Sequence, residues 1–116
     1  MKLVLALTTE ANQAKAEALA AQLLEQRLAA CIALQQQQSL YHWQGRIERD
    51  SEVQLLIKTS PEQLEALQIA LHKMHSYDVP EWIVLPAECS DGYGSWLTSS
   101  LKPPLPKPGD AAEPGL

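Results

Sequence analysis

The sequence contains no phenylalanine, and aromatic residues make up only 5% of it. Its apolar volume comes mainly from leucine and alanine, and no apolar run approaches the roughly 20 residues that a membrane-spanning helix needs. Hydrophobic residues still account for 46% of the 116 positions, which is enough for an ordinary core without a disulfide framework. The length suits one domain, and we assign residues 1–101 to it.

Cysteine and basic charge are also scarce. Cys31 and Cys89 lie far apart and form no Cys-x-x-Cys motif, so we expect reduced thiols. The net charge is -5, which argues against the basic face that a general nucleic-acid binder would show. The apolar segment at residues 3–7 is too short for the hydrophobic region of a secretory signal. We therefore expect a cytoplasmic protein that has neither a nucleic acid nor a membrane as its partner.

Familiar catalytic signatures are missing as well. The sequence has no Ser-His-Asp order, no glycine-rich phosphate loop and no His-Glu-x-x-His zinc motif. We therefore do not expect an enzyme.

The most prominent feature that is present runs from Cys31 to Thr59, where two β-patterned segments flank a tight centre at residues 41–45. Gly45 supplies the positive φ that a short hairpin connection needs. Arms of about eleven to fourteen residues reach roughly 36 Å or more at about 3.3 Å per residue, well beyond the roughly 17–20 Å of an ordinary strand. A domain this small leaves such arms uncovered, and exposed sheet edges recruit other chains. The hairpin therefore predicts self-association.

The rest of the sequence alternates between strand and helix patterns. Thr8 or Thr9 is expected to cap the first helix, with Glu10 in its first turn. The expected order is β-α-β-β-α-β plus a C-terminal helix, which is the ferredoxin-like arrangement of the α+β class. Right-handed crossovers place both long helices on one sheet face, so the other face needs the C-terminal helix or another subunit. Outside the hairpin we expect a strand at 3–7, a helix at 11–28, a helix at 60–75, a strand at 81–85 ended by Pro86, a helix at 90–101 and an extended proline-rich tail at 102–116.

Four strings at characteristic spacing carry a family resemblance. They are LAAC at 28–31, SLYHWQG at 39–45, EVQLLIKT at 52–59 and HSYDVPE at 75–81. With them the chain resembles the CutA family, the divalent-cation tolerance proteins, from residue 2 to residue 101. The resemblance implies a ferredoxin-like subunit, a homotrimer with inter-subunit sheets built from the long hairpins, and a role in tolerance of copper and other divalent metals.

The resemblance also indicates where a metal would bind. Metal-binding members present a cysteine at the end of the first strand and a His-His pair before Pro-Tyr, and the matching positions here include Thr8, Met74 and His75. We take His75, Met74 and Cys31 as candidate ligands for copper or another divalent cation, since thiolate, thioether and imidazole suit copper. Alternatively, Cys31 is a small buried hydrophobe and Met74 belongs to the core. Cys89 is a second candidate thiol.

Aromatic residues gather at the expected hairpin tip. Tyr41, His42 and Trp43 are candidate anchors of the trimer interface, because tryptophan and tyrosine are enriched at such places. Left on a solvated loop in a single chain, they would form an apolar patch that solubility disfavours.

A ligand cleft between subunits is a further expectation of the resemblance. Lys58 would offer a cation, Tyr77 a hydroxyl and Glu81 a carboxylate, although a plain Lys–Glu ion pair explains the first and last equally well. An alternative function is therefore a trimeric signalling or small-ligand module of the PII type, with ligands in inter-subunit clefts. A purely structural interaction protein is the third hypothesis.

Overall fold

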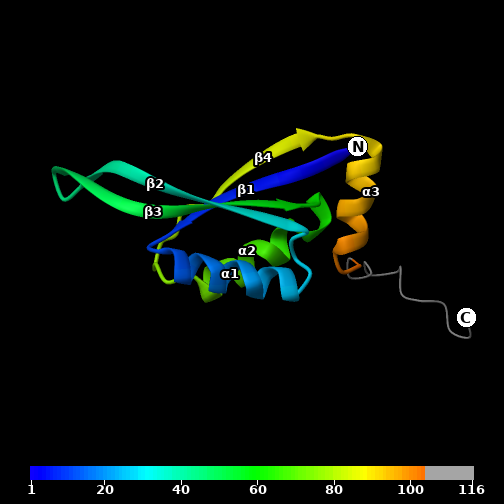
Figure 1. Cartoon of the computed structure of the whole chain (residues 1–116), viewed down its shortest axis with the longest axis horizontal. Helices are drawn as coiled ribbons and strands as arrows, with labels where there is room; N and C mark the ends of the chain where they lie inside the picture. The colour runs from blue at the N-terminus through cyan, green and yellow to red at the C-terminus, as the bar shows by residue number, and fades with distance from the viewer. Residues whose placement is uncertain (104–116) are drawn as a thin grey trace, which may run out of the picture.

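The computed structural model describes residues 1–103, which form an antiparallel four-stranded sheet with two helices on one face (Figure 1). The predicted α+β class and order of elements are confirmed, and the proline-rich tail from residue 104 onward lies outside the described residues. Spatially the strands run β2-β3-β1-β4. In chain order the elements are β1 (Lys2–Glu10), α1 (Gln13–Glu25), β2 (Cys31–Trp43), β3 (Arg46–Thr59), the 3-10 turn η1 (Pro61–Gln63), α2 (Leu64–Met74), β4 (Ile83–Glu88) and α3 (Asp91–Ser100).

The long hairpin has the predicted length, with 13 residues in β2 and 14 in β3. Its two strands stay paired from Cys31 opposite Lys58 to Trp43 opposite Arg46. Strand β1 pairs with β3 only as far as Val53. The part of the hairpin at residues 37–52, here called the distal hairpin, therefore pairs with no third strand among residues 1–103 and projects from the body (Figure 1).

A two-residue turn closes the hairpin at Gln44 and Gly45. Both residues have positive φ, 50° and 76° respectively. Two consecutive positive φ values are those of a type I′ turn, whose twist matches that of the flanking strands. The predicted role of Gly45 is confirmed, and Gln44 adopts the same left-handed region without being glycine.

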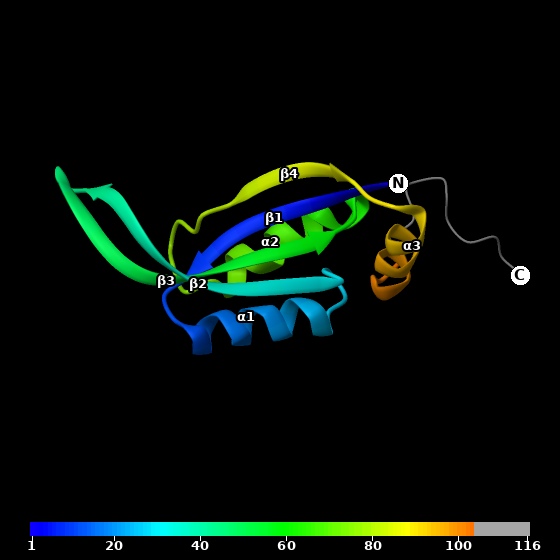
Figure 2. The ribbon, with the colours of Figure 1, turned by 45° about the horizontal axis from the view of Figure 1, so that its top comes forward.

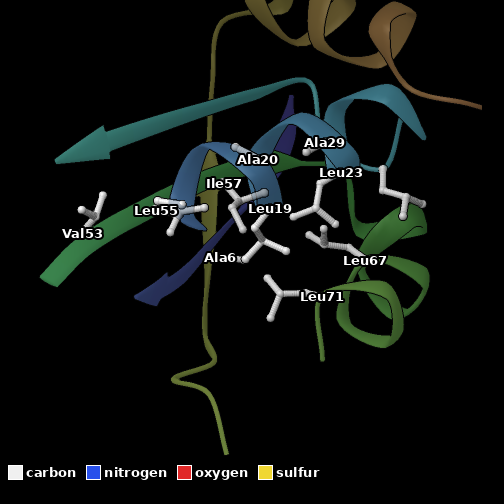
Figure 3. Packing of buried hydrophobic residues seen from close by; sticks show 12 residues of the cluster. Ala6, Leu19, Ala20, Leu23, Ala29, Val53, Leu55, Ile57, Leu67 and Leu71 are labelled. Carbon is white, nitrogen blue, oxygen red and sulfur yellow. The ribbon is translucent and has the colours of Figure 1, made fainter. Parts of the chain in front are cut away.

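One face of the sheet carries the main core. Side chains of β1 and β3 pack there against α1 and α2, as Figure 3 shows. Its fully buried members include Ala6, Leu23, Leu55, Ile57, Leu67 and Leu71.

Helix α3 lies at one end of the sheet (Figure 2), where Leu97 and Leu101 pack on Leu3 of the opposite face. Further along this face, Ile83 and Leu85 on β4 are each 45% exposed. Of the two covers expected for this face, the C-terminal helix supplies part. Exposed apolar side chains remain on the rest of the face within residues 1–103. No helix within residues 1–103 is both long enough and apolar enough to span a membrane.

Several boundaries differ from the sequence expectation. Strand β1 continues through Thr8, Thr9 and Glu10, because these residues pair with β3, and the helix cap is Asn12, whose side chain accepts the Lys15 N–H at 2.9 Å. The expected caps Thr8 and Thr9, and Glu10 in the first helical turn, were therefore wrong. Pro86 was expected to end the last strand but lies within it. Proline is tolerated there because β4 is an edge strand.

Candidate functional site

An open groove of about 920 Å³ lies between the distal hairpin and the loop that joins α2 to β4. Its lining includes four carboxylates, and none of the described lining residues is Lys, Arg or His. We call it the acidic groove. It is lined by Thr9, Gln37, Ser39, Leu40, Tyr41, Trp43, Asp50, Glu52, Tyr77, Asp78, Val79 and Glu81.

The hairpin wall of the acidic groove is set by strand register. Ser39 lies opposite Asp50, and Gln37 lies opposite Glu52, so these side chains share one face of the ribbon. Tyr41, two residues beyond Ser39, has the same orientation, and its hydroxyl donates a hydrogen bond to Asp50. This bond and the nearby carboxylates raise the pKa of Tyr41 to about 12. The wall is therefore negatively charged, and its phenol stays protonated in neutral solution.

The loop wall is anchored by a buried polar cluster at the end of β1. The Glu10 side chain, only 2% exposed, accepts hydrogen bonds from the Ser76 N–H at 3.1 Å and from the Ser76 hydroxyl. His75 Nε2 lies 2.7 Å from the Thr9 carbonyl, and its Nδ1 accepts the Tyr77 N–H at 3.0 Å. We call Glu10, His75 and Ser76 the loop anchor, because these bonds fix the start of the loop on the central strand.

Tyr77 connects the loop to the hairpin. Its hydroxyl donates to a Glu52 carboxylate oxygen at 3.4 Å. Burial, followed by the charge of Glu52, raises the pKa of Tyr77 above its ordinary value. The phenol therefore remains a donor that joins the two walls.

The three candidate metal ligands lie apart in a single chain. Cys31 pairs with Lys58, which pairs with Leu5, whereas His75 contacts the other end of β1. The Met74 sulfur packs against the main core, 4.0 Å from the Gln26 amide nitrogen.

The His75 side chain is fully buried, and its two ring nitrogens contact the Thr9 carbonyl and the Tyr77 N–H. A metal bound to His75 would have to displace one of these hydrogen bonds. Within residues 1–103, no three His, Cys, Asp or Glu side chains converge as a metal site. The predicted ligand set is therefore not assembled within one chain.

The predicted cleft residues divide between two places. Tyr77 and Glu81 line the acidic groove. Lys58 lies toward the other end of the sheet, where its Nζ is 3.3 Å from the Tyr93 hydroxyl and 5.5 Å from the centre of that ring. The Lys–Glu ion pair weighed from the sequence is thus not formed within the chain, because Lys58 and Glu81 are separated along the sheet.

The aromatic tip residues are exposed in the single chain. Trp43 is 57% exposed and lines the acidic groove together with Tyr41, whereas His42 is exposed on the tip without lining it. Sequence reasoning missed Asp50, Glu52 and Asp78. The spacing of two between Asp50 and Glu52 was the available signal, since it places both carboxylates on one face of a strand.

Comparison with known proteins gives consistent matches over the folded part of the chain. The model of the family described as CutA1 divalent ion tolerance protein matches residues 4–100. The divalent-cation tolerance protein CutA of Pectobacterium atrosepticum is 46% identical over 101 residues, which is 85% of this chain and 92% of the relative. The crystal structure of CutA1 from Pyrococcus horikoshii superposes with a TM-score of 0.84 at 32% identity, covering 86% of this chain and 99% of that one. The structure of the periplasmic divalent cation tolerance protein CutA from Archaeoglobus fulgidus has a TM-score of 0.81 at 28% identity, covering 88% and 100%. The chain therefore belongs to the CutA1 family of divalent ion tolerance proteins.

Proposed function

We propose that this protein contributes to metal tolerance by binding divalent cations, copper among them, weakly and reversibly in the acidic groove. The family and its relatives are named for tolerance of divalent cations. The observation that carries the proposal is the concentration of Asp50, Glu52, Asp78 and Glu81 around one open groove without a basic lining residue among those described. A cleft lined by charges of one sign raises the local concentration of the opposite ion.

Weak binding follows from the geometry of these carboxylates. They come from two separate segments and do not converge as a coordination sphere within one chain. The attraction is therefore mainly the field of exposed charges, which salt screens with a Debye length of about 8 Å at physiological ionic strength. Cation binding is accordingly expected to fall as salt rises.

Titration calorimetry with Cu²⁺ and Zn²⁺ on the full chain, at low and at physiological salt, tests this proposal. The variant Asp50→Asn/Glu52→Gln removes two groove charges, and Glu62→Gln/Glu65→Gln removes two exposed charges elsewhere. Only the groove variant is expected to lose binding. Equal losses of binding in both variants would mean that the net charge of the protein, and not the groove, attracts the cation. If His75→Gln keeps its fold but loses all binding, the ligand set expected from the sequence is favoured instead.

We also propose that the ferredoxin-like subunits assemble as a homotrimer through their hairpins. The distal hairpin has no third strand, and Leu40, Trp43 and Ile47 are 61%, 57% and 71% exposed on it. A second copy placed against Tyr41, His42 and Trp43 would cover these groups and turn the acidic groove into a cleft between chains. Light scattering is expected to give three times the 12.8 kDa chain mass, and a monomer at micromolar concentration would contradict this.

A second candidate function is that of a PII-type small-ligand module. The groove volume of about 920 Å³ lies within the roughly 300–1,000 Å³ of small-molecule sites. Tyr41, Trp43 and Tyr77 line it and favour a flat ligand that stacks on aromatic rings. A thermal-shift screen of nucleotides and metabolites tests this alternative, and the lack of any stabilising compound would count against it.

A cytoplasmic, non-catalytic role completes the proposal. The apolar segment near the start of the sequence forms the central strand β1, and both cysteines have free thiols. Fractionation of cells that produce the full chain tests the location, and recovery with periplasmic markers would contradict it.

A further inference from the structure

Two sulfur atoms lie beside Gly94 at the end of the sheet that is away from the acidic groove. A Cβ built on Gly94 of α3 would lie 2.4 Å from Met1 Sδ and 3.1 Å from Cys89 Sγ. Both sulfurs therefore face the same point from different segments of the chain. Met1 is 47% exposed and Cys89 is partly buried.

The backbone holds these two residues side by side. Strands β1 and β4 pair with Lys2 opposite Glu88, and beyond them the Cys89 N–H donates to the Met1 carbonyl at 2.8 Å. The Ser90 hydroxyl then caps α3 by accepting the Tyr93 N–H. The positions of Met1 and Cys89 are thus set by the sheet and by the start of a helix, rather than by a free loop.

Gly94 provides the space for this approach. A glycine in a helix interior costs about 1 kcal/mol relative to alanine, yet Gly94 lies within the ten residues of α3 and is buried. Alanine at this position would push the Met1 sulfur away. Gly92, two residues earlier, has nothing within 4 Å of an added Cβ. The close approach therefore requires glycine at 94 and not at 92.

We infer that Met1 and Cys89 form a binding site for Cu(I), with the thiolate and the thioether as its two sulfur ligands. Soft thiolate and thioether ligands favour soft ions such as Cu(I) over hard cations such as Mg²⁺ and Ca²⁺. Binding exchanges the Cys89 thiol proton for the metal, so one proton is released and no electron is transferred. The carboxylates of Glu88 and Asp91 lie 4.0 and 3.7 Å from the Met1 ammonium nitrogen, so these three groups together carry one net negative charge at the same corner. This inference deepens the proposed role in metal tolerance, but it uses a different surface and a different ion.

The chain contains matched controls, because it has one further cysteine and one further methionine. Cys31 lies at the start of edge strand β2, and Met74 ends α2. The test is anaerobic competition for Cu(I) between the reduced full chain and the chelator bicinchoninate, followed by absorbance. Wild type is expected to bind one Cu(I) per chain. Cys89→Ser is expected to lose affinity by about tenfold or more, and Cys31→Ser to match wild type.

Two glycine variants test the geometry without removing a ligand. Gly94→Ala displaces the Met1 sulfur and is expected to weaken Cu(I) binding by about tenfold, whereas Gly92→Ala is expected to bind like wild type. Wild-type affinity in Cys89→Ser, or equal loss in the two glycine variants, would overturn the site. Circular dichroism of each variant verifies that the fold is kept.

X-ray absorption at the copper edge identifies the thioether directly. Protein carrying Met74→Leu and labelled with selenomethionine contains selenium only at Met1, once its mass shows that Met1 is retained. A copper–selenium scattering path is expected, and its absence would remove Met1 from the site. The groove variant Asp50→Asn/Glu52→Gln should keep Cu(I) affinity, so failure of the sulfur site and failure of the groove are distinguishable.

Discussion

Replacing Glu10 with alanine tests whether the loop anchor fixes the loop wall of the acidic groove. Glu10 accepts hydrogen bonds from the backbone and the hydroxyl of Ser76 and from the Ala11 N–H at 3.3 Å, and it lies 3.6 Å from His75 Nδ1. Alanine removes all of these contacts at a position that is 2% exposed. The Ser76 groups then lose their acceptor in a partly buried place.

The expected loss can be bounded from the type of contact. The Glu10 carboxylate accepts three hydrogen bonds, and a hydrogen bond to a charged group contributes about 1.5–3 kcal/mol. These contributions are not additive because the bonds share one carboxylate, so we expect Glu10→Ala to lower the free energy of unfolding by about 3–5 kcal/mol. That is a large part of the roughly 5–15 kcal/mol of a typical domain. Glu10→Gln keeps the volume and one acceptor oxygen, so its loss should be smaller.

Urea denaturation at one fixed subunit concentration measures this loss, since association would make stability depend on concentration. Amide exchange gives a local measurement, because the Ser76 and Tyr77 N–H groups should lose protection first. Glu17→Ala is the control, since Glu17 is exposed on α1 and accepts one bond, from Gln13. A loss below about 1 kcal/mol in Glu10→Ala, the size of one ordinary hydrogen bond, would refute the assigned role of the loop anchor.

Three further variants test other parts of the structure. Thr59→Val removes a buried hydroxyl that donates to the Leu28 carbonyl at 2.7 Å, and we expect a loss of about 1–3 kcal/mol in urea denaturation; an unchanged midpoint would contradict it. Trp43→Ala should weaken the proposed trimer by about 2 kcal/mol or more, and an oligomer distribution that stays the same on dilution would count against the interface. The Asp50 bond, together with the nearby carboxylates, raises the pKa of Tyr41 from 10.0 to about 12. The stabilisation from the protonated phenol is therefore present below pH 10 and is lost as the pH rises through 12. The tyrosinate absorbance of wild type minus that of Tyr41→Phe should show this late titration, and a midpoint near 10 would oppose it.

The hairpin was predictable because its signals are local. Gly45 marks the turn, and the β-patterned segments from Cys31 and toward Thr59 give arms of nearly the observed length. The boundaries at Glu10 and Pro86 were not predictable in the same way. Whether a strand continues there depends on its partner and on its place at the edge of the sheet, which only the assembled fold supplies.

The candidate site was less accessible to sequence reasoning, because its contacts join distant segments. Glu10 looked like an acidic residue in a helical first turn, yet it holds Ser76, 66 positions later. His75 looked like a metal ligand because the resemblance placed it there, yet in this chain its ring nitrogens bind backbone groups. A local pattern gives the chemistry of a side chain, but hydrogen-bond partners from other segments decide whether that chemistry is free to act.

Strand β1 separates the two proposed metal surfaces. The acidic groove and the loop anchor lie at its Glu10 end, and the Met1–Cys89 pair lies at its Lys2 end. Nine residues at about 3.3 Å each span roughly 26–30 Å, well beyond the roughly 7–10 Å within which variants usually couple. The two surfaces also differ in chemistry, since the carboxylates of the groove attract divalent cations by their charge, whereas the sulfur atoms suit Cu(I). A variant in the acidic groove should therefore lose divalent cations and keep Cu(I). A variant at the Met1–Cys89 pair should lose Cu(I) and keep divalent cations.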